Sequence, residues 1–158
     1  MGKPHRFEVQ VVWTGNTGQG TLNYRAYKRD YEILGASKQI AIPGSSDPVF
    51  RGDGARYNPE ELLIASLSAC HMLWMLHLCA DAGITLTSYA DRADGDMAIA
   101  GDGSGCFTEV RLRPAITIAD GARIQEAEAL NERAHHLCFI ANSVNFPVRC
   151  LPSVTAAA

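Results

Sequence analysis

Residues 58–83 read NPEELLIASLSACHMLWMLHLCADAG, and they predict one long helix over residues 59–82. Asn58 is a strong N-cap residue, and the proline after it fits the first helical position. The next two residues are glutamates, which favour the positive end of the helix dipole. Gly83 is a natural stop. Because the run is apolar nearly all round, we expect the helix to be central and covered on most faces.

The composition is that of an ordinary globular protein. The 158 residues are 47% hydrophobic and 20% charged, with a net charge of −3. This length predicts a single domain over residues 1–158. No basic stripe stands out, so no nucleic-acid partner is expected. The chain starts without an apolar signal-peptide core and carries an odd number of cysteines, so a cytoplasmic location is expected.

The long helix is also long enough for a membrane span, but polar side chains interrupt it. They are Glu60, Glu61, His71, His77 and Asp81. We therefore expect no membrane partner.

The N-terminal part of the chain is expected to be rich in β-strands over residues 1–57. It holds a first strand at residues 6–13 and a second at residues 21–33, joined as a hairpin through the turn GNTGQG. A helix-strands-helix-strand segment follows over residues 58–153. The tail at residues 154–158 is expected to be loose.

Downstream of the long helix, the pattern predicts three strands in a meander over residues 84–119 and a second helix over residues 121–138. The second helix has one apolar stripe at three- and four-residue spacing. The stripe consists of Ile124, Ala127, Leu130, Ala134 and Leu137. Helices packed on one face of a mostly antiparallel sheet give an α+β fold.

The cysteines raise the question of function. A lone cysteine in an apolar helix, as Cys70 is, usually packs as a small hydrophobe, and the same holds for Cys79, Cys106 and Cys150. Cys138 ends a polar-faced helix in AHHLCFIANSV, and we expect its thiol to be partly accessible. If Cys70 and Cys138 meet, one can be an attacking thiolate and the other a resolving thiol.

An attacking thiol must ionise near neutral pH, which requires a nearby cation or helix N-terminus. Cys70 lies about 12 residues past its own cap, so an arginine from elsewhere must lower its pKa. The available arginines precede the helix: Arg25, Arg29, Arg51 and Arg56.

Metal binding is the alternative chemistry for the same residue types. The candidate ligands are Cys70, His71, His77, Cys79, His135, His136 and Cys138. They form neither a C-x-x-C nor an H-E-x-x-H motif, and adjacent residues of a helix point about 100° apart. The simpler interpretation of His77 is a hydrogen-bonded partner within the core. We therefore expect no metal site and no cofactor.

Two motifs together resemble the OsmC/Ohr family of osmotically inducible protein C and organic hydroperoxide resistance proteins. They are NPEELLIASLSAC at residues 58–70 and AHHLCFIANSV at residues 134–144. The resemblance covers roughly residues 7–153. It implies an OsmC-like fold, in which mostly antiparallel sheets wrap around two central helices. It also implies an intertwined homodimer with active sites at the subunit interface.

The chemistry that the resemblance implies is thiol-dependent reduction of organic hydroperoxides in oxidative stress defence. Cys70 falls on the peroxidatic cysteine, Cys138 on the resolving cysteine, and Glu60 on the glutamate that pairs with the activating arginine. OsmC-type members place that arginine at the position of Arg51, which is the one we expect, whereas Ohr-type members favour Arg25 or Arg29. The implied partners are an organic hydroperoxide and a dithiol reductant, for which a lipoyl-type dithiol is the candidate.

This chain departs from the family pattern at three places, which indicates a divergent OsmC-like subgroup. His71 follows the first cysteine, Phe139 follows the second, and the arginine region is longer, with RGDGAR at residues 51–56. A non-catalytic redox-sensing or small-ligand-binding protein is the alternative function. On one straight helix Glu60 and Cys70 are about 15 Å apart. They share a site only if the helix breaks, giving two helices, or if the chain folds back through the dimer.

Overall fold

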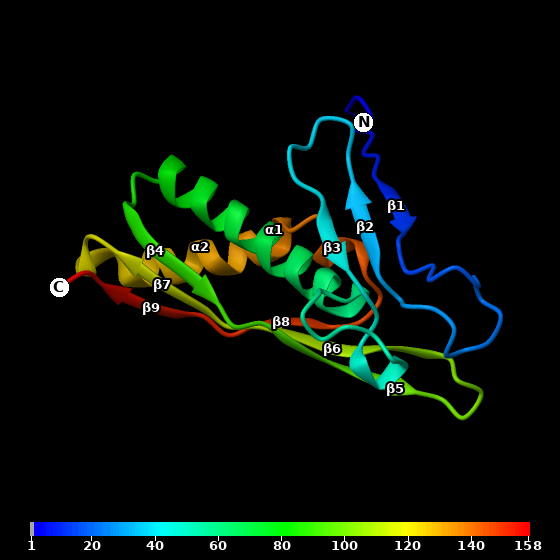
Figure 1. Cartoon of the computed structure of the whole chain (residues 1–158). Helices are drawn as coiled ribbons and strands as arrows, with labels where there is room; N and C mark the ends of the chain where they lie inside the picture. The colour runs from blue at the N-terminus through cyan, green and yellow to red at the C-terminus, as the bar shows by residue number, and fades with distance from the viewer. Residues whose placement is uncertain (1) are drawn as a thin grey trace. The chain divides into compact units, whose positions relative to one another are not determined.

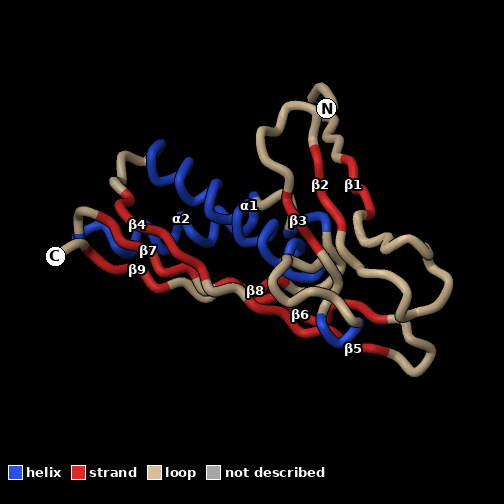
Figure 2. Tube along the Cα trace, in the orientation of Figure 1, coloured by secondary structure: helices blue, strands red, loops and turns tan. Residues whose placement is uncertain are grey.

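The computed structural model describes residues 2–158, which form two compact units. The first ends at Leu62 and the second comprises Leu63–Ala158. The boundary lies a few residues beyond the expected end of the β-rich segment at residue 57, inside the first turn of the long helix. Figures 1 and 2 show the strands of the first unit and the mixed helices and strands of the second.

The first unit contains a three-stranded antiparallel sheet in the order β1-β2-β3. Its strands are β1 (Gln10–Trp13), β2 (Tyr31–Leu34) and β3 (Ile42–Gly44), and a 3-10 turn, η1 (Pro48–Phe50), follows. Trp13 pairs with Tyr31, so the predicted hairpin exists.

The second strand was predicted from residue 21, and this is wrong, because residues 21–30 form turns and irregular backbone. Arg29 accounts for the difference. Its guanidinium lies 4.2 Å from the ring centroid of Tyr24 and 4.1 Å from that of Tyr27. The same group donates hydrogen bonds to the backbone carbonyls of both tyrosines. These bonds coil the segment locally instead of extending it.

Helix α1 (Pro59–Asp81) has nearly the predicted bounds. The Glu61 N–H donates to Asn58 Oδ1 at 2.8 Å, and the Asn58 N–H donates to Glu61 Oε2 at 3.1 Å, a reciprocal capping box. The helix runs unbroken, so the two-helix alternative is wrong. By length and composition α1 could cross a membrane, but core helices of soluble proteins also pass that test.

The second unit holds six strands in two sheets, with orders β4-β7-β9 and β5-β6-β8. They are β4 (Leu86–Asp91), β5 (Asp94–Ile99), β6 (Gly105–Leu112), β7 (Pro114–Ile118), β8 (Val148–Cys150) and β9 (Ser153–Ala156). The predicted three-stranded meander is wrong, because four strands occupy that region and β4 pairs with β7 around the β5-β6 hairpin.

The C-terminal strands β8 and β9 pair parallel to β6 and β7. The tail expected to be loose is therefore ordered through Ala156, and the Ala157 N–H also donates to the Ile118 carbonyl at 2.8 Å. The remaining pairings are antiparallel, so the mostly antiparallel α+β fold is confirmed.

Helix α2 (Ile124–Leu137) follows a short 3-10 turn, η2 (Gly121–Arg123), and a further turn, η3 (Ala141–Ser143), comes after it. The predicted apolar stripe of α2 is confirmed and packs with α1 against β7. The fully or nearly fully buried members of this core are Met75, Leu78, Cys79, Ile84, Ile116, Ile118, Ala127 and Ala134. α1 and α2 lie side by side in this unit (Figure 1).

Candidate functional site

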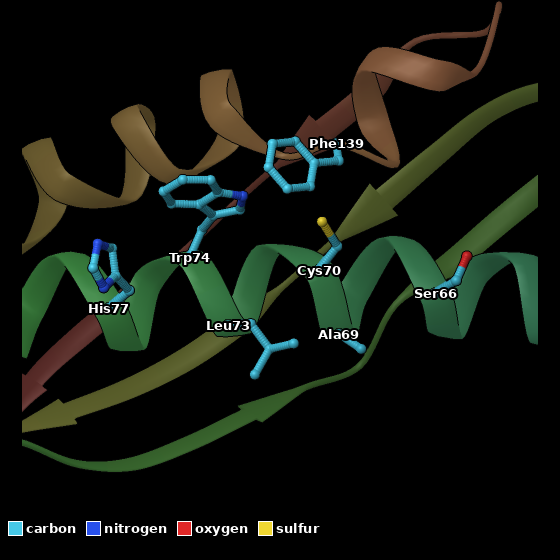
Figure 3. Close-up of a pocket in the computed structure, with 7 residues that line it drawn as sticks. All are labelled: Ser66, Ala69, Cys70, Leu73, Trp74, His77 and Phe139. Atoms are coloured by element: carbon cyan, nitrogen blue, oxygen red, sulfur yellow. The ribbon is translucent and has the colours of Figure 1, made fainter. Parts of the chain in front are cut away.

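Cys70 lines an apolar pocket of the second unit. This pocket has a volume of about 550 Å³, within the range of roughly 300–1,000 Å³ typical of small-molecule sites. Its lining comprises Ser66, Ala69, Cys70, Leu73, Trp74, His77 and Phe139. Figure 3 shows the Cys70 sulfur pointing from α1 toward the side on which Trp74 and Phe139 lie. A hydrophobic molecule in this pocket would therefore meet a half-buried free thiol.

Aromatic side chains form one wall of the pocket. The Trp74 ring meets the Phe139 ring edge to face, with centroids 5.5 Å apart, and meets the His77 ring in the same manner at 5.8 Å. His77 is exposed. The prediction that it is a satisfied partner within the core is therefore wrong, and it supplies a polar group to an otherwise apolar pocket.

Cys138 lies at the C-cap of α2 and is 0% exposed. The expectation of a partly accessible thiol is wrong, because η3 folds back over it and the Ala141 N–H donates to its sulfur at 3.4 Å. Burial raises the pKa of the Cys138 thiol to about 11, although the backbone N–H groups of Ala141 and Ile140 act in the opposite direction. Hydrogen bonding and charge interaction with Cys70 raise this pKa further.

The structure thus brings Cys70 and Cys138 together in one unit, as two free thiols of unequal exposure. Cys138 stays protonated at neutral pH, since its pKa is raised and it lies at the negative end of the α2 dipole. Of the two thiols, Cys70 is the one that lines the apolar pocket.

A second group of polar side chains lies buried beside these thiols. His71 Nε2 donates to Asn131 Oδ1 at 2.8 Å, and both residues are 0% exposed. Asn131 Nδ2 in turn donates to Cys150 Sγ at 3.5 Å. Sequence reasoning missed this group. Its one signal is Asn131, a polar residue on the apolar stripe of α2.

Burial keeps His71 neutral, since desolvation lowers its pKa below 6.5. As the pH falls from about 6.5 toward the pKa of His71 in the folded chain, this histidine binds a proton in the unfolded chain but not in the folded chain. We expect the free energy of unfolding to decrease across this window. Urea denaturation at several pH values checks this, and His71→Gln should lose this part of the dependence. Parallel curves for both proteins would contradict the assignment.

The remaining site candidates lie in the first unit or at its end. Glu60 occupies the first turn of the unbroken α1, about 15 Å along the helix axis from Cys70. Arg51 is exposed at the end of η1 with a φ of 65°. Arg29, an alternative for the activating role, instead lines a cavity of about 360 Å³ with Trp13, Thr21, Tyr27, Tyr31, Ser45, Ser46 and Pro59.

Glu60 acts on the same cavity of the first unit. Burial raises the pKa of Tyr31, and the negative charge of Glu60 raises it further. The hydroxyl of Tyr31 is buried without a hydrogen-bond partner. Within residues 2–62, Arg29 thus lines this cavity, and the charge of Glu60 acts on one of its lining residues, Tyr31.

The metal alternative gains no support from the geometry. Among residues 2–158, no three histidine, cysteine, aspartate or glutamate side chains are grouped so as to hold a metal ion.

Comparison with solved structures confirms the fold. An OsmC-like protein of unknown function from Vibrio cholerae is 26% identical, with a TM-score of 0.82 over 96% of this chain and 100% of that one. An organic hydroperoxide resistance protein from Elizabethkingia anophelis has a TM-score of 0.67 at 19% identity, over 98% of this chain and 100% of that one. An organic hydroperoxide resistance protein OsmC from Legionella pneumophila has a TM-score of 0.63 at 18% identity, over 96% of this chain and 99% of that one.

Comparison with proteins of curated function found no match. The family described as OsmC-like protein matches residues 52–150, which include Cys70, Cys138 and both helices. This match covers more than half of the chain and agrees with the resemblance of the two cysteine motifs. The chain therefore belongs to the OsmC-like protein family.

Proposed function

We propose that this protein is a thiol-dependent peroxidase for organic hydroperoxides, with Cys70 as attacking thiolate and Cys138 as resolving thiol. One observation carries the proposal: a half-buried thiol at an apolar pocket lies beside a buried thiol that stays protonated. Family membership supports a peroxide-related role, as do similar structures described as organic hydroperoxide resistance proteins.

In the first step the Cys70 thiolate attacks the distal oxygen of the hydroperoxide. The O–O bond breaks, and the alkoxide takes a proton and leaves as the alcohol. Cys70 becomes a sulfenic acid. The apolar pocket suits the organic group of the substrate, because Leu73, Trp74 and Phe139 offer it contacts that hydrogen peroxide cannot use.

In the second step Cys138 condenses with the sulfenic acid. Its sulfur attacks the sulfur of Cys70, the S–O bond breaks, and the hydroxide leaves with the Cys138 proton as water. The raised pKa of Cys138 keeps this thiol unreactive toward peroxide before the first step. A dithiol, of which the lipoyl type is one candidate, then reduces the disulfide.

The activating arginine and Glu60 complete the proposal. Arg51 is the arginine that the OsmC-type pattern favours, but Arg29 has the support of its stacked and hydrogen-bonded placement. Glu60 is about 15 Å along α1 from Cys70 of its own chain. We therefore propose that these groups act across a homodimer. The exposed apolar residues Leu73 and Leu76 on α1 support such an interface.

The test is consumption of cumene hydroperoxide with dithiothreitol as reductant. Wild-type protein should turn over, Cys70→Ser should fall to the rate of dithiothreitol alone, and Cys106→Ser, at an exposed position, should match wild type. Unchanged turnover in Cys70→Ser would refute the proposal. Sedimentation of the same active samples should give twice 17.1 kDa, and a fully active 17.1 kDa species would refute the dimer.

A further inference from the structure

We infer that the buried His71–Asn131 hydrogen bond is a clamp that fixes the position of Cys70 relative to Cys138. His71 and Asn131 are then positioning residues for disulfide closure. His71 follows Cys70 directly on α1, and Asn131 precedes Cys138 by two turns of α2. The bond measures 2.8 Å, and neither residue is exposed. The kinetic consequence of this inference rests on the proposed function.

The placement of the clamp connects it geometrically to the thiols. Seven residues of α-helix make nearly two full turns, so Asn131 and Cys138 lie on the same face of α2. On α1, a neighbouring residue cannot shift or rotate without moving Cys70. A slide of one helical turn, about 5.4 Å, would stretch the 2.8 Å bond beyond hydrogen-bonding distance.

Apolar packing alone does not fix this register. The α1–α2 core includes Met75 and Leu78 against Ala127 and Ala134, and such contacts are non-directional. Among residues 2–158, the clamp is the one hydrogen bond between side chains of α1 and α2. Because the site is buried, water cannot replace a lost partner, and sliding leaves a polar group unpaired.

Cys150 lies against the clamp from β8. Asn131 Nδ2 donates to Cys150 Sγ at 3.5 Å, and the same sulfur lies 3.6 Å from His71 Nε2 and 3.8 Å from Asn131 Oδ1, so Cys150 contacts both partners of the clamp. Burial raises the pKa of Cys150 to about 11, so its sulfur stays a neutral thiol that accepts this bond. The third thiol thus has a placement role and is kept unreactive.

Precise placement matters because disulfide closure has strict geometry. The two Cα atoms must lie about 4.4–6.8 Å apart, and a misplacement of about 1 Å can cost roughly a hundredfold in rate. In closure, Cys70–SOH and Cys138–SH give the disulfide and water. A slow closure leaves the sulfenic acid open to a second hydroperoxide, which oxidises it to sulfinic acid and leaves an alcohol.

The primary test needs no peroxide. Wild type, Asn131→Leu, His71→Leu and His71→Gln are equilibrated with oxidised and reduced dithiothreitol, and mass spectrometry measures the Cys70–Cys138 disulfide. We expect the equilibrium constant to fall about tenfold or more in both leucine variants, equivalent to about 30 mV. His71→Gln keeps a donor for Asn131 Oδ1, so its equilibrium constant should stay close to that of wild type.

Two further proteins separate positioning from stability. Ile118→Val removes one buried methylene from the same core and should leave the equilibrium within twofold of wild type. The double variant His71→Leu/Asn131→Leu leaves neither clamp partner buried and unpaired, so it should fold even where a single variant does not. It should still show the tenfold loss. A wild-type constant in the double variant, or an equal loss in Ile118→Val, would overturn the inference.

With cumene hydroperoxide, the leucine variants should shift the product from the disulfide toward Cys70 sulfinic acid. The rate at which Cys70 is first oxidised to the sulfenic acid should stay within about twofold of the wild-type rate. An unchanged product ratio would overturn the clamp. If wild type consumes no hydroperoxide, the proposed function fails, whereas the dithiothreitol equilibrium still decides the clamp.

Discussion

Replacing Cys138 with serine is expected to stop turnover after two equivalents of hydroperoxide per subunit, one for each oxygen atom that Cys70 gains. Cys70 stays at its pocket in this variant and can still be oxidised to the sulfenic acid. A serine hydroxyl does not ionise near neutral pH and cannot form the disulfide. With excess hydroperoxide, Cys70 should therefore progress to sulfinic acid. Mass spectrometry of the intact protein measures this as the gain of two oxygen atoms in place of the loss of two hydrogens.

Cys106→Ser is the matched control, because it also exchanges a cysteine for a serine but at an exposed position. It should form the Cys70–Cys138 disulfide as wild type does. Sustained turnover of Cys138→Ser with dihydrolipoamide at the wild-type rate would contradict the resolving role. Another thiol would then have to reach Cys70.

The helices were predictable from the sequence because their signals are local. Asn58, Pro59 and Glu61 specify the start of α1 within a few residues, and the observed capping box uses two of them. The stripe of α2 likewise follows from three- and four-residue spacing alone. The adjacency of the two cysteines needed more than spacing, since their positions were matched through the family resemblance.

The strand pairings were not predictable in the same way, because they join distant segments. Nothing within residues 148–156 signals that β8 and β9 pair parallel to β6 and β7. Residues 21–30 have the composition of a strand, but stacking of Arg29 on two tyrosines overrides that preference. Asn131 was overlooked because its partner His71 lies 60 positions away.

Truncation of Trp74 to alanine is expected to reduce selectivity for organic hydroperoxides. The indole forms the wall of the pocket beside Cys70 and packs edge to face on Phe139. Losing about 80 Å² of apolar contact with a bound cumyl group, at roughly 25 cal/mol/Å², costs about 2 kcal/mol. That corresponds to about a thirtyfold loss in kcat/KM for cumene hydroperoxide. Steady-state kinetics with both cumene hydroperoxide and hydrogen peroxide measures the change.

Hydrogen peroxide discriminates between loss of the pocket wall and general damage to the site, because it has no apolar group for Trp74 to contact. Its kcat/KM should stay within about twofold, since Cys70 and Cys138 keep their positions. Ile99→Ala is the control, because it removes an exposed apolar side chain of the same unit that does not line this pocket. An equal loss for both peroxides, or a thirtyfold loss in Ile99→Ala, would show that Trp74 acts through the fold and not through the substrate.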